Sequence, residues 1–413
     1  MKEKEIMNGH PISRRTAIKY FGTTLAIGSV GIGFPGILKA ADTVKIGFLA
    51  PLTGHSTDFG VGMMYVTQLA VEEVNAQGGA GGRKVELIIE DDQMSPKVTV
   101  DKTQKLIFKD NVDVIMGLGT GGEMVACRVT CRKANQLMMT FTTQDMSPPP
   151  CYPFEAGVGI CINQFIDPLA TWLVKNMGKN IYLVGTDDIW PRTHAKRLKM
   201  MLDSLGGKLV GEEYFPYATQ DFGPSIRRIL KAQPDAVYVV FQDDVSILMK
   251  QYRGFGGKAP FICPILSETY AEGIGEAAEN TIVCSPYLMS VNTPENKTLL
   301  ANMKRKYPEQ YKGRPGMIMV TAHGEGCYTQ VWRYKLAIEK AGSVEKEKVV
   351  KAIPQLKFNS PQGPVVTNPK NLQRVHNMRI FRIVKDSKAD FGYRGEILWE
   401  CGQINPIVPI CDT

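Results

Sequence analysis

The stretch Val112-Asp-Val-Ile-Met-Gly-Leu-Gly-Thr-Gly-Gly-Glu123 predicts a buried strand that runs through a glycine-rich turn into a helix. Its glycines at 117, 119 and 122 have the GxGxxG spacing of dinucleotide-binding turns. The start of a helix offers unpaired backbone N–H groups and a partial positive charge, which suit a carboxylate or an amide oxygen as well as a pyrophosphate. The stretch therefore predicts one unit of an α/β protein and leaves two kinds of ligand open.

The alternation of strand and helix extends to both sides of this stretch. Upstream, residues 44–50 and 84–90 are predicted strands, and each is followed by a predicted helix, over about 58–75 and 96–109. Downstream, a helix over 123–134 leads to a strand over 137–142. This alternation predicts a mainly parallel sheet flanked by helices.

A second series begins after the Pro-rich segment 145–159. Helices are predicted at 164–177, 192–205, 223–232 and 245–254, and strands at 180–185, 208–214, 236–241, 261–266 and 281–287. Helices over about 294–352 are expected to cover the first sheet, and the β-rich end of the chain to complete the second. The prediction is one lobe from 43–160 and 292–355, a second from 161–291 and 356–413, and a hinged cleft between them.

The first forty residues differ from the rest. Ser13-Arg14-Arg15-Thr-Ala-Ile-Lys19 precedes an uncharged, glycine-rich apolar run from Tyr20 to Leu38. This order predicts a twin-arginine signal over residues 1–40 and export to the periplasm, with cleavage left open. A membrane-spanning helix is the alternative, but the glycines and weak apolarity of the run argue against it.

The charge balance is mild. The first forty residues contain six basic and two acidic residues, so the net charge of +8 falls to +4 without them. No stripe of Lys and Arg with interleaved aromatic residues occurs, so nucleic-acid binding is not expected. A length of 413 residues predicts two or more domains.

Nine cysteines are many for this length, and an exported protein can oxidise them. Spacing and turn-rich surroundings suggest three disulfides, although sequence does not fix connectivity. The suggested pairs are Cys151 with Cys161, Cys263 with Cys284, and Cys401 with Cys411. Cys127 and Cys131 have helical i, i+4 spacing, but no second ligand pair accompanies them, so they are interpreted as buried thiols and no metal site is predicted.

Two observations weigh against a dinucleotide at 117–122. The fingerprint usually opens the first strand–helix unit of its domain, whereas two units precede it here. The acid expected for a ribose hydroxyl would be Asp145, which lies in the Pro-rich exit segment rather than at the end of the next strand. GxSxG, HExxH and paired CxxC patterns are absent and the five histidines do not cluster, so an enzyme is not predicted.

Several motifs in order resemble the leucine/isoleucine/valine-binding proteins, the type I periplasmic solute-binding proteins of ABC importers. They are Ile46-Gly-Phe-Leu-Ala-Pro-Leu-Thr-Gly54, Ala70-Val-Glu-Glu-Val-Asn-Ala-Gln-Gly-Gly79 and Val85-Glu-Leu-Ile-Ile-Glu-Asp-Asp92. Gly185-Thr-Asp-Asp-Ile-Trp-Pro-Arg192 and Gly206-Gly-Lys-Leu-Val-Gly-Glu-Glu-Tyr214 look most like the amide- and urea-binding branch. The resemblance covers nearly the whole chain after residue 40 and implies a two-lobed α/β fold.

The resemblance also implies a set of ligand contacts. The first lobe would supply Phe59, Thr120, Gly121, Gly122, Thr142 and Thr143, and the second Asp188, Trp190, Gln242 (or Asp243) and Glu268. Phe141-Thr-Thr143 replaces the Pro-Ala-Ala-like residues of amino-acid binders, and Asp188 replaces an aromatic residue of the amide branch. The ligand is therefore left open among an amino acid, a short amide or urea, and an aromatic carboxylate.

Each singled-out side chain has a structural alternative. Trp190 follows a strand and can stack on a planar ligand, or it can be a rim or core residue. Asp188 can bind a ligand amine or cap the next helix ahead of Pro191. Glu268 can bind an ammonium group or be a solvated loop acid, and Phe59 can be ligand wall or core.

The function expected from the resemblance is capture of a small polar solute in the cleft and its delivery to a membrane-embedded ABC permease. Such a protein is expected to act as a periplasmic monomer without a cofactor. The alternative is an exported oxidoreductase that binds a nicotinamide nucleotide at 117–122.

Overall fold

The computed structural model describes residues 43–54, 57–119, 121–141, 152–241, 245–312 and 320–407. Several positions singled out in the sequence lie outside these ranges. They are the predicted export signal, Thr120, Thr142, Thr143, Asp145, Cys151, Gln242, Asp243 and Cys411.

A parallel sheet with the order β2-β1-β3-β4-β5 forms the first part of the fold. Its strands are β1 (Val44–Ala50), β2 (Val85–Asp91), β3 (Val114–Gly117), β4 (Met138–Thr140) and β5 (Glu155–Gly157). Helices α1 (Thr57–Ala76), α2 (Pro96–Phe108) and α3 (Gly121–Ala134) connect them. Side chains of β1 alternate between two buried clusters, one containing α1 and the other α2 and α3, so both faces of the sheet are covered.

The second sheet has the order β11-β12-β13-β10-β9-β8-β6-β7, and β14 pairs with β13. Its parallel strands are β6 (Asn180–Thr186), β7 (Lys208–Phe215), β8 (Ala236–Val240), β9 (Phe261–Ile262) and β10 (Ile282–Ser285). The helices along this segment are α4 (Ile162–Asn176), α5 (Ile189–Ser204), α6 (Gly223–Ala232), α7 (Ser246–Gly254) and α8 (Glu268–Ile274). Helices α4 and α5 pack on one face of the sheet, and α6, α7 and α8 on the other.

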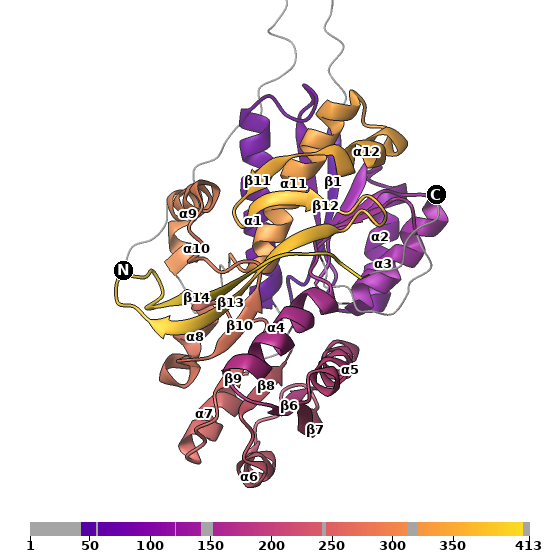
Figure 1. The fold of residues 1–413 in the computed structure, drawn as a ribbon. Helices are drawn as coiled ribbons and strands as arrows, with labels where there is room; N and C mark the ends of the chain where they lie inside the picture. The colour runs from indigo at the N-terminus through magenta and orange to yellow at the C-terminus, as the bar shows by residue number, and fades with distance from the viewer. Residues whose placement is uncertain are drawn as a thin grey trace, which may run out of the picture. The chain divides into compact units, whose positions relative to one another are not determined.

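The C-terminal third contributes to both sheets. Its elements are α9 (Pro294–Lys306), α10 (Pro308–Lys312), α11 (Ala322–Ala341), α12 (Lys346–Ala352), β11 (Phe358–Ser360), β12 (Gly363–Thr367), β13 (Arg374–Lys385) and β14 (Tyr393–Ile404). Figure 1 shows α11 beside α1, and the two share the cluster that covers the first sheet. Leu299 and Met303 of α9 belong instead to a cluster on the second sheet, unlike the expectation for helices over 294–352. The antiparallel strands β13 and β14 extend the second sheet. All strand pairs among β1 to β10 are parallel, which confirms the predicted mainly parallel α/β fold.

Helix starts follow local capping chemistry. Ser95 and Thr293 accept hydrogen bonds from backbone N–H groups two or three residues into α2 and α9, and a proline occupies the first helical turn of each. Thr321 caps α11 through Gly324 N–H. These caps fix where each helix begins, whereas packing against the sheets fixes its orientation.

A buried polar network joins α11 to the strands β11 to β13. The Glu325 carboxylate accepts hydrogen bonds from Thr329 Oγ1 at 2.7 Å and from Gln362 Nε2 at 2.5 Å, and Arg374 Nη1 lies at 3.4 Å. The two ring nitrogens of His376 contact the Gln362 side-chain oxygen and the Val158 carbonyl oxygen, both at 3.0 Å. The network thus connects Val158, which follows β5 of the first sheet, to α11 and to the strands β11 to β13.

The cysteines correct one prediction. Cys263 and Cys284 are buried free thiols, and they belong to the clusters on opposite faces of the second sheet, so the predicted disulfide between them is wrong. Cys263 is level with Val283, the residue before Cys284 in β10, and successive residues of a strand point to opposite faces of the sheet. Cys161 and Cys401 are also free thiols, and the partners suggested for them lie outside the described residues.

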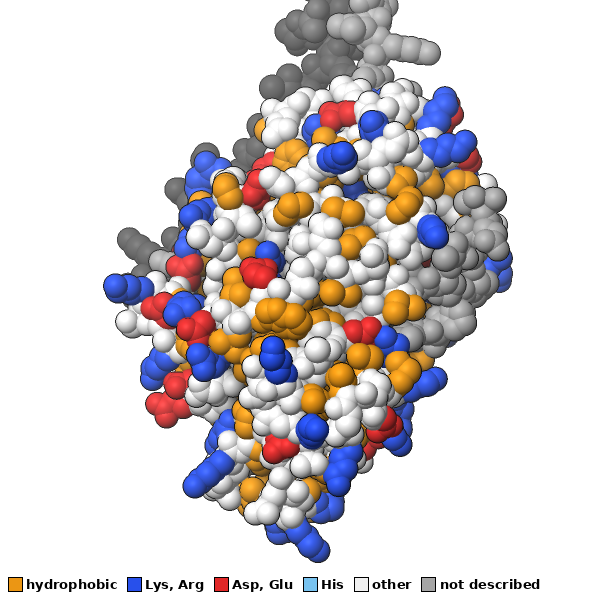
Figure 2. Space-filling model, viewed as in Figure 1, with side chains coloured by type: hydrophobic (Ala, Val, Ile, Leu, Met, Phe, Trp, Pro, Cys, Tyr) orange, Lys and Arg blue, Asp and Glu red, His pale blue; other side chains and the backbone are white. Residues whose placement is uncertain are grey.

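Cys127 and Cys131 are confirmed as buried thiols, with their sulfur atoms 3.7 Å apart on α3. On the molecular face shown in Figure 2, basic and acidic side chains are interspersed with apolar ones.

Candidate ligand-binding site

The strand order of the first sheet creates a switch point between β1 and β3. From β1 the chain passes to β2 on one side, and from β3 it passes to β4 on the other side. In open α/β sheets, ligands bind at such a switch point, at the carboxyl ends of the strands. The loop that leads into Phe59 and the glycine loop after β3 flank this point.

Asp91 organises the loop after β1. Its Oδ1 accepts a hydrogen bond from Leu52 N–H at 2.9 Å, and its Oδ2 accepts one from Thr53 Oγ1 at 2.5 Å. Because Asp91 is the last residue of the neighbouring strand β2, it fixes the loop that leads into α1. Phe59, half-buried in the first turn of α1, is therefore held close to the switch point.

Three rings from distant parts of the chain form an aromatic cluster. His323, in the first turn of α11, packs edge-on against Phe59 and against Phe141, with ring centroids 4.5 Å apart in both pairs. Such edge-to-face pairs are worth about 0.5–1.5 kcal/mol each beyond their buried area. A Cβ atom on Gly326 would lie 1.7 Å from the Phe141 ring, so the glycine on α11 makes room for that ring.

His323 was not identified from the sequence. Burial lowers its pKa to about 3, so the imidazole is neutral near pH 7. Although the surrounding rings desolvate the imidazole, part of the side chain remains exposed, and within the described residues neither ring nitrogen has a hydrogen-bond partner. A neutral imidazole offers one N–H donor and one acceptor nitrogen, so His323 can bind a polar group of a ligand.

In the glycine loop after β3, one glycine is required by the backbone turn and two have free space beside their Cα atoms. Gly117 has a φ of +92°, and a Cβ atom there would lie 2.1 Å from the Leu49 carbonyl oxygen, which accepts a hydrogen bond from Leu118 N–H. This glycine is required by the turn. A Cβ atom on Gly121 would meet nothing within 4 Å, and one on Gly122 would meet only Pro96. Gly121 and Gly122 form the first turn of α3.

A buried carboxyl group lies at the end of β2. Asp92 is fully buried, its Oδ1 accepts a hydrogen bond from Met94 N–H at 3.1 Å, and its Oδ2 has no partner in the described part of the chain. Burial, together with the charges of Glu123 and Asp91, raises the pKa of Asp92 to about 7. The folded protein therefore holds this proton more tightly than the unfolded chain does.

Asp92→Asn is expected to change the pH dependence of stability. Since the folded pKa lies above the unfolded value, wild-type stability is full below about pH 4 and falls as the pH rises through about 7. At pH 8 the variant should be about 2 kcal/mol more stable, roughly half the full linkage value because relaxation offsets part of it. Urea unfolding at pH 4, 6 and 8 measures this, with exposed Asp101→Asn as control. Equal pH profiles for wild type and Asp92→Asn would contradict the prediction.

The second sheet has its own switch point between β6 and β8. Asp188 follows β6 and caps α5, because its Oδ1 accepts a hydrogen bond from Trp190 N–H at 3.3 Å. Its Oδ2 accepts a second one from Tyr217 Oη at 3.0 Å. Helix capping was the alternative role considered from sequence for Asp188. In the structure both carboxylate oxygens accept hydrogen bonds from groups of the protein.

Trp190 is almost completely buried at the start of α5. Its ring packs edge-on against His194 with centroids 4.5 Å apart, within the cluster between the sheet and α4 and α5. The indole Nε1 is buried and has no hydrogen-bond partner among the described residues. An unsatisfied buried N–H group is costly, so a hydrogen bond to this donor would be favourable.

Glu268 differs from the solvated loop acid considered from sequence. It is the first residue of α8 and is 3% exposed. Its carboxylate accepts hydrogen bonds from the backbone N–H groups of Met289 at 3.2 Å and Ser290 at 2.9 Å. The carboxylate therefore holds the segment after β10 in place.

The structure brings together only part of the predicted set. Phe59 and the first turn of α3 lie at the first switch point, and Asp188 and Trp190 at the second. The contact between His323 and Phe141 was not predicted, because it joins distant segments of the chain. The available local signal was a His two residues after the capping residue Thr321.

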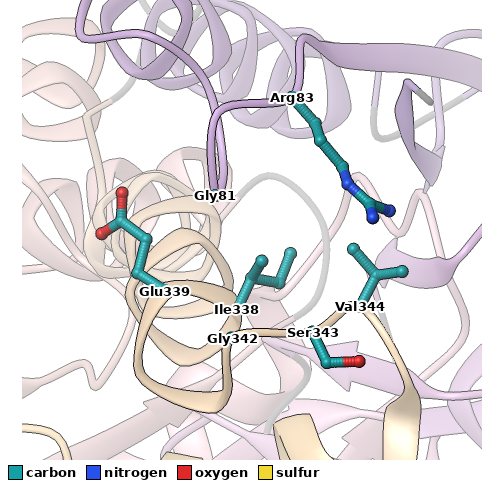
Figure 3. A pocket seen from close by; sticks show the side chains of 7 residues that line it. All are labelled: Gly81, Arg83, Ile338, Glu339, Gly342, Ser343 and Val344. Atoms are coloured by element: carbon teal, nitrogen blue, oxygen red, sulfur yellow. The ribbon is translucent and has the colours of Figure 1, made fainter. Parts of the chain in front are cut away.

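A pocket of about 240 Å³ lies elsewhere. It is lined by the loop before β2 and the end of α11, and Figure 3 shows Glu339 turned away from Arg83. Since Arg83 precedes β2, the pocket lies at the amino ends of the strands, opposite the switch point. Across the described ranges, no group of three or more His, Cys, Asp and Glu side chains is arranged for a metal, and no helix is long and apolar enough to cross a membrane.

Comparison with known families identifies the chain. A family model described as periplasmic binding protein matches residues 43–388. The chain belongs to this family. Its members bind small-molecule solutes and work with ABC permeases, and the family implies a periplasmic location.

Relatives agree with the predicted resemblance to type I binding proteins. The leucine-, isoleucine-, valine-, threonine- and alanine-binding protein of Pseudomonas aeruginosa is 24% identical over 367 residues, covering 86% of this chain and 94% of that protein. Leu/Ile/Val-binding protein homolog 6 of Brucella suis is also 24% identical, over 371 residues that cover 86% of this chain and 91% of its own.

Solved structures share the two-lobed fold. A solute-binding protein of an ABC transporter from Rhodopseudomonas palustris, in complex with 3,4-dihydroxybenzoic acid, has a TM-score of 0.77 at 22% identity, covering 90% of this chain and 98% of its own. A leucine-binding protein from Thermotoga maritima has a TM-score of 0.74 at 21% identity, covering 88% and 99%. The type I periplasmic binding protein fold predicted from sequence is thereby confirmed.

Proposed function

We propose that this periplasmic binding protein captures a small solute between the switch points of its two sheets and delivers it to an ABC permease without changing it chemically. The observation that carries the proposal is the pair of switch points, each with aromatic side chains and unused hydrogen-bonding groups. Closure of the two lobes would bury the solute, and hydrogen bonds formed away from water would supply affinity.

The proposed contacts keep the residues expected from the resemblance. Phe59 and the first turn of α3 would contact the solute from the first lobe, and Trp190 from the second. Thr120, Thr142, Thr143 and Gln242 remain proposed contacts by resemblance. Asp188 and Glu268 support the site through the backbone groups that they bind.

Unfolding in the presence of a solute panel tests the proposal. The panel contains amino acids, short amides, urea, aromatic carboxylates and NAD(P). A bound solute at about one hundred times its dissociation constant should add about 2.7 kcal/mol to the free energy of unfolding. Stabilisation by NAD(P) alone would replace the proposal with the oxidoreductase alternative, and stabilisation by no member would contradict it.

Two variants test the site itself. Phe59→Ala removes a ring from the first lobe, and Trp190→Phe removes the unpaired indole N–H while keeping an aromatic ring. Each is expected to weaken solute binding about tenfold, which corresponds to about 1.4 kcal/mol. Calorimetric titration measures the affinities, and Trp399→Ala, at a partly exposed position on β14, is the control. Unchanged affinity in both variants would place the site elsewhere.

A further inference from the structure

We infer that the captured solute is an aromatic carboxylate without an ammonium group, and that His323 determines this specificity. The inference rests on the proposed capture function and names its substrate class. Three sets of contacts carry it: the acids near the two switch points, the aromatic cluster, and the position of His323.

The described acids near the second switch point are already occupied, and those of the first lobe, Asp92 and Glu123, are 0% and 2% exposed. Asp188 accepts hydrogen bonds from Trp190 N–H and Tyr217 Oη, and Glu268 accepts two from backbone N–H groups. Asp187 pairs with Arg192, whose Nη2 lies 2.7 Å from its carboxylate. Enclosing an ammonium group without a carboxylate partner costs several kcal/mol. These contacts therefore disfavour an α-amino acid.

The first lobe instead offers an aromatic wall. Phe59, His323 and Phe141 meet edge to face, and a Cβ atom on Gly119 would lie 3.5 Å from the Phe59 ring. Gly119 thus leaves the Phe59 ring uncovered by a side chain on that side. A planar ring that packs against such a wall gains both apolar burial and ring–ring attraction.

His323 lies where the two lobes meet. The preceding residue, Ala322, packs against both apolar clusters of the second sheet, one of which contains Trp190. His323 itself packs against the rings of the first lobe. Its hydrogen-bonding nitrogens have no partner among the described residues, so an imidazole N–H can be donated to a carboxylate or hydroxyl oxygen of the solute.

Matched ligands test the substrate class. L-phenylalanine and 3-phenylpropanoate differ only in the ammonium group, as do L-leucine and 4-methylpentanoate. We expect 3-phenylpropanoate or a hydroxybenzoate to bind at least tenfold more tightly than L-phenylalanine and L-leucine in calorimetric titrations of the purified protein. Tenfold tighter binding of either amino acid would overturn the inference. Binding of only an amide or urea would overturn it too, while leaving capture intact. Binding of no solute in the panel would overturn capture as well.

Variants at His323 test its role. His323→Leu removes both ring nitrogens and should weaken binding of the aromatic carboxylate about tenfold, while His323→Gln, which keeps a donor, should stay within about threefold of wild type. Urea unfolding checks that both variants are folded. If His323→Leu lowers stability but leaves the affinities and their order unchanged, the residue is structural and its assigned role is wrong.

Discussion

Glu325→Ala is expected to lower the free energy of unfolding by about 3–5 kcal/mol, the largest loss that we predict for a single charged side chain. Glu325 is fully buried, and Arg374, which lies 3.4 Å from its carboxylate, is 1% exposed. Without the carboxylate, Arg374 would be a buried cation with no acidic partner. The Gln362 amide and the Thr329 hydroxyl would lose an acceptor as well.

A second buried guanidinium increases the expected loss. Arg333 is fully buried on α11, and burial together with the nearby Arg374 lowers its pKa to about 9. Arg374 is paired with the Glu325 carboxylate, whereas Arg333 donates hydrogen bonds to the Gly157 and Leu372 carbonyl oxygens and to the Thr367 hydroxyl. Removing the negative charge leaves the mutual repulsion of the two guanidinium groups without compensation.

The measurement is urea unfolding of Glu325→Ala beside Glu339→Gln. Glu339 lies on the same helix, its side chain is 39% exposed, and it pairs with Lys335 at 2.7 Å. Because Glu339 is far more exposed than Glu325 and glutamine keeps an acceptor for Lys335, the control should lose much less stability than Glu325→Ala. Similar losses in the two variants would show that the Glu325 network does not have the energetic importance assigned to it.

Gly117→Ala is expected to cost about 3 kcal/mol or more. A positive φ of 92° strains any residue with a Cβ atom, and the added methyl group would lie 2.1 Å from the Leu49 carbonyl oxygen. That oxygen belongs to β1, so relief of the clash would separate β1 from β3 at the switch point. Stability and solute affinity should both fall.

Gly121→Ala is the matched control in the same loop. Its φ is not in the left-handed region, and the added methyl group would meet nothing within 4 Å. Its stability should stay within about 1 kcal/mol of wild type, because alanine also favours the helix that begins there. A large loss of stability in Gly121→Ala, or none in Gly117→Ala, would contradict this account of the glycine loop.

Much of the fold could be predicted from sequence because its signals are local. Continuous apolar runs bounded by turn residues indicated the buried parallel strands, and Ser, Thr or Pro at helix starts indicated helix boundaries. The three-residue strand β5 was missed, since so short a run after a Pro-rich segment carries no periodicity. The helix that begins at Glu268 was also missed, and with it the burial of that acid.

Local sequence patterns were enough to predict most strands and helices in their order, the family, and the loops in which ligand contacts are expected. Which side chains in those loops already have partners became clear from the folded structure. It paired Asp188 and Glu268 with groups of the protein, placed Cys263 and Cys284 on opposite sheet faces, and brought His323 between Phe59 and Phe141. The physical reason is that backbone preferences and apolar periodicity act over a few neighbouring residues, whereas burial and hydrogen-bond partnership depend on residues far apart in the chain.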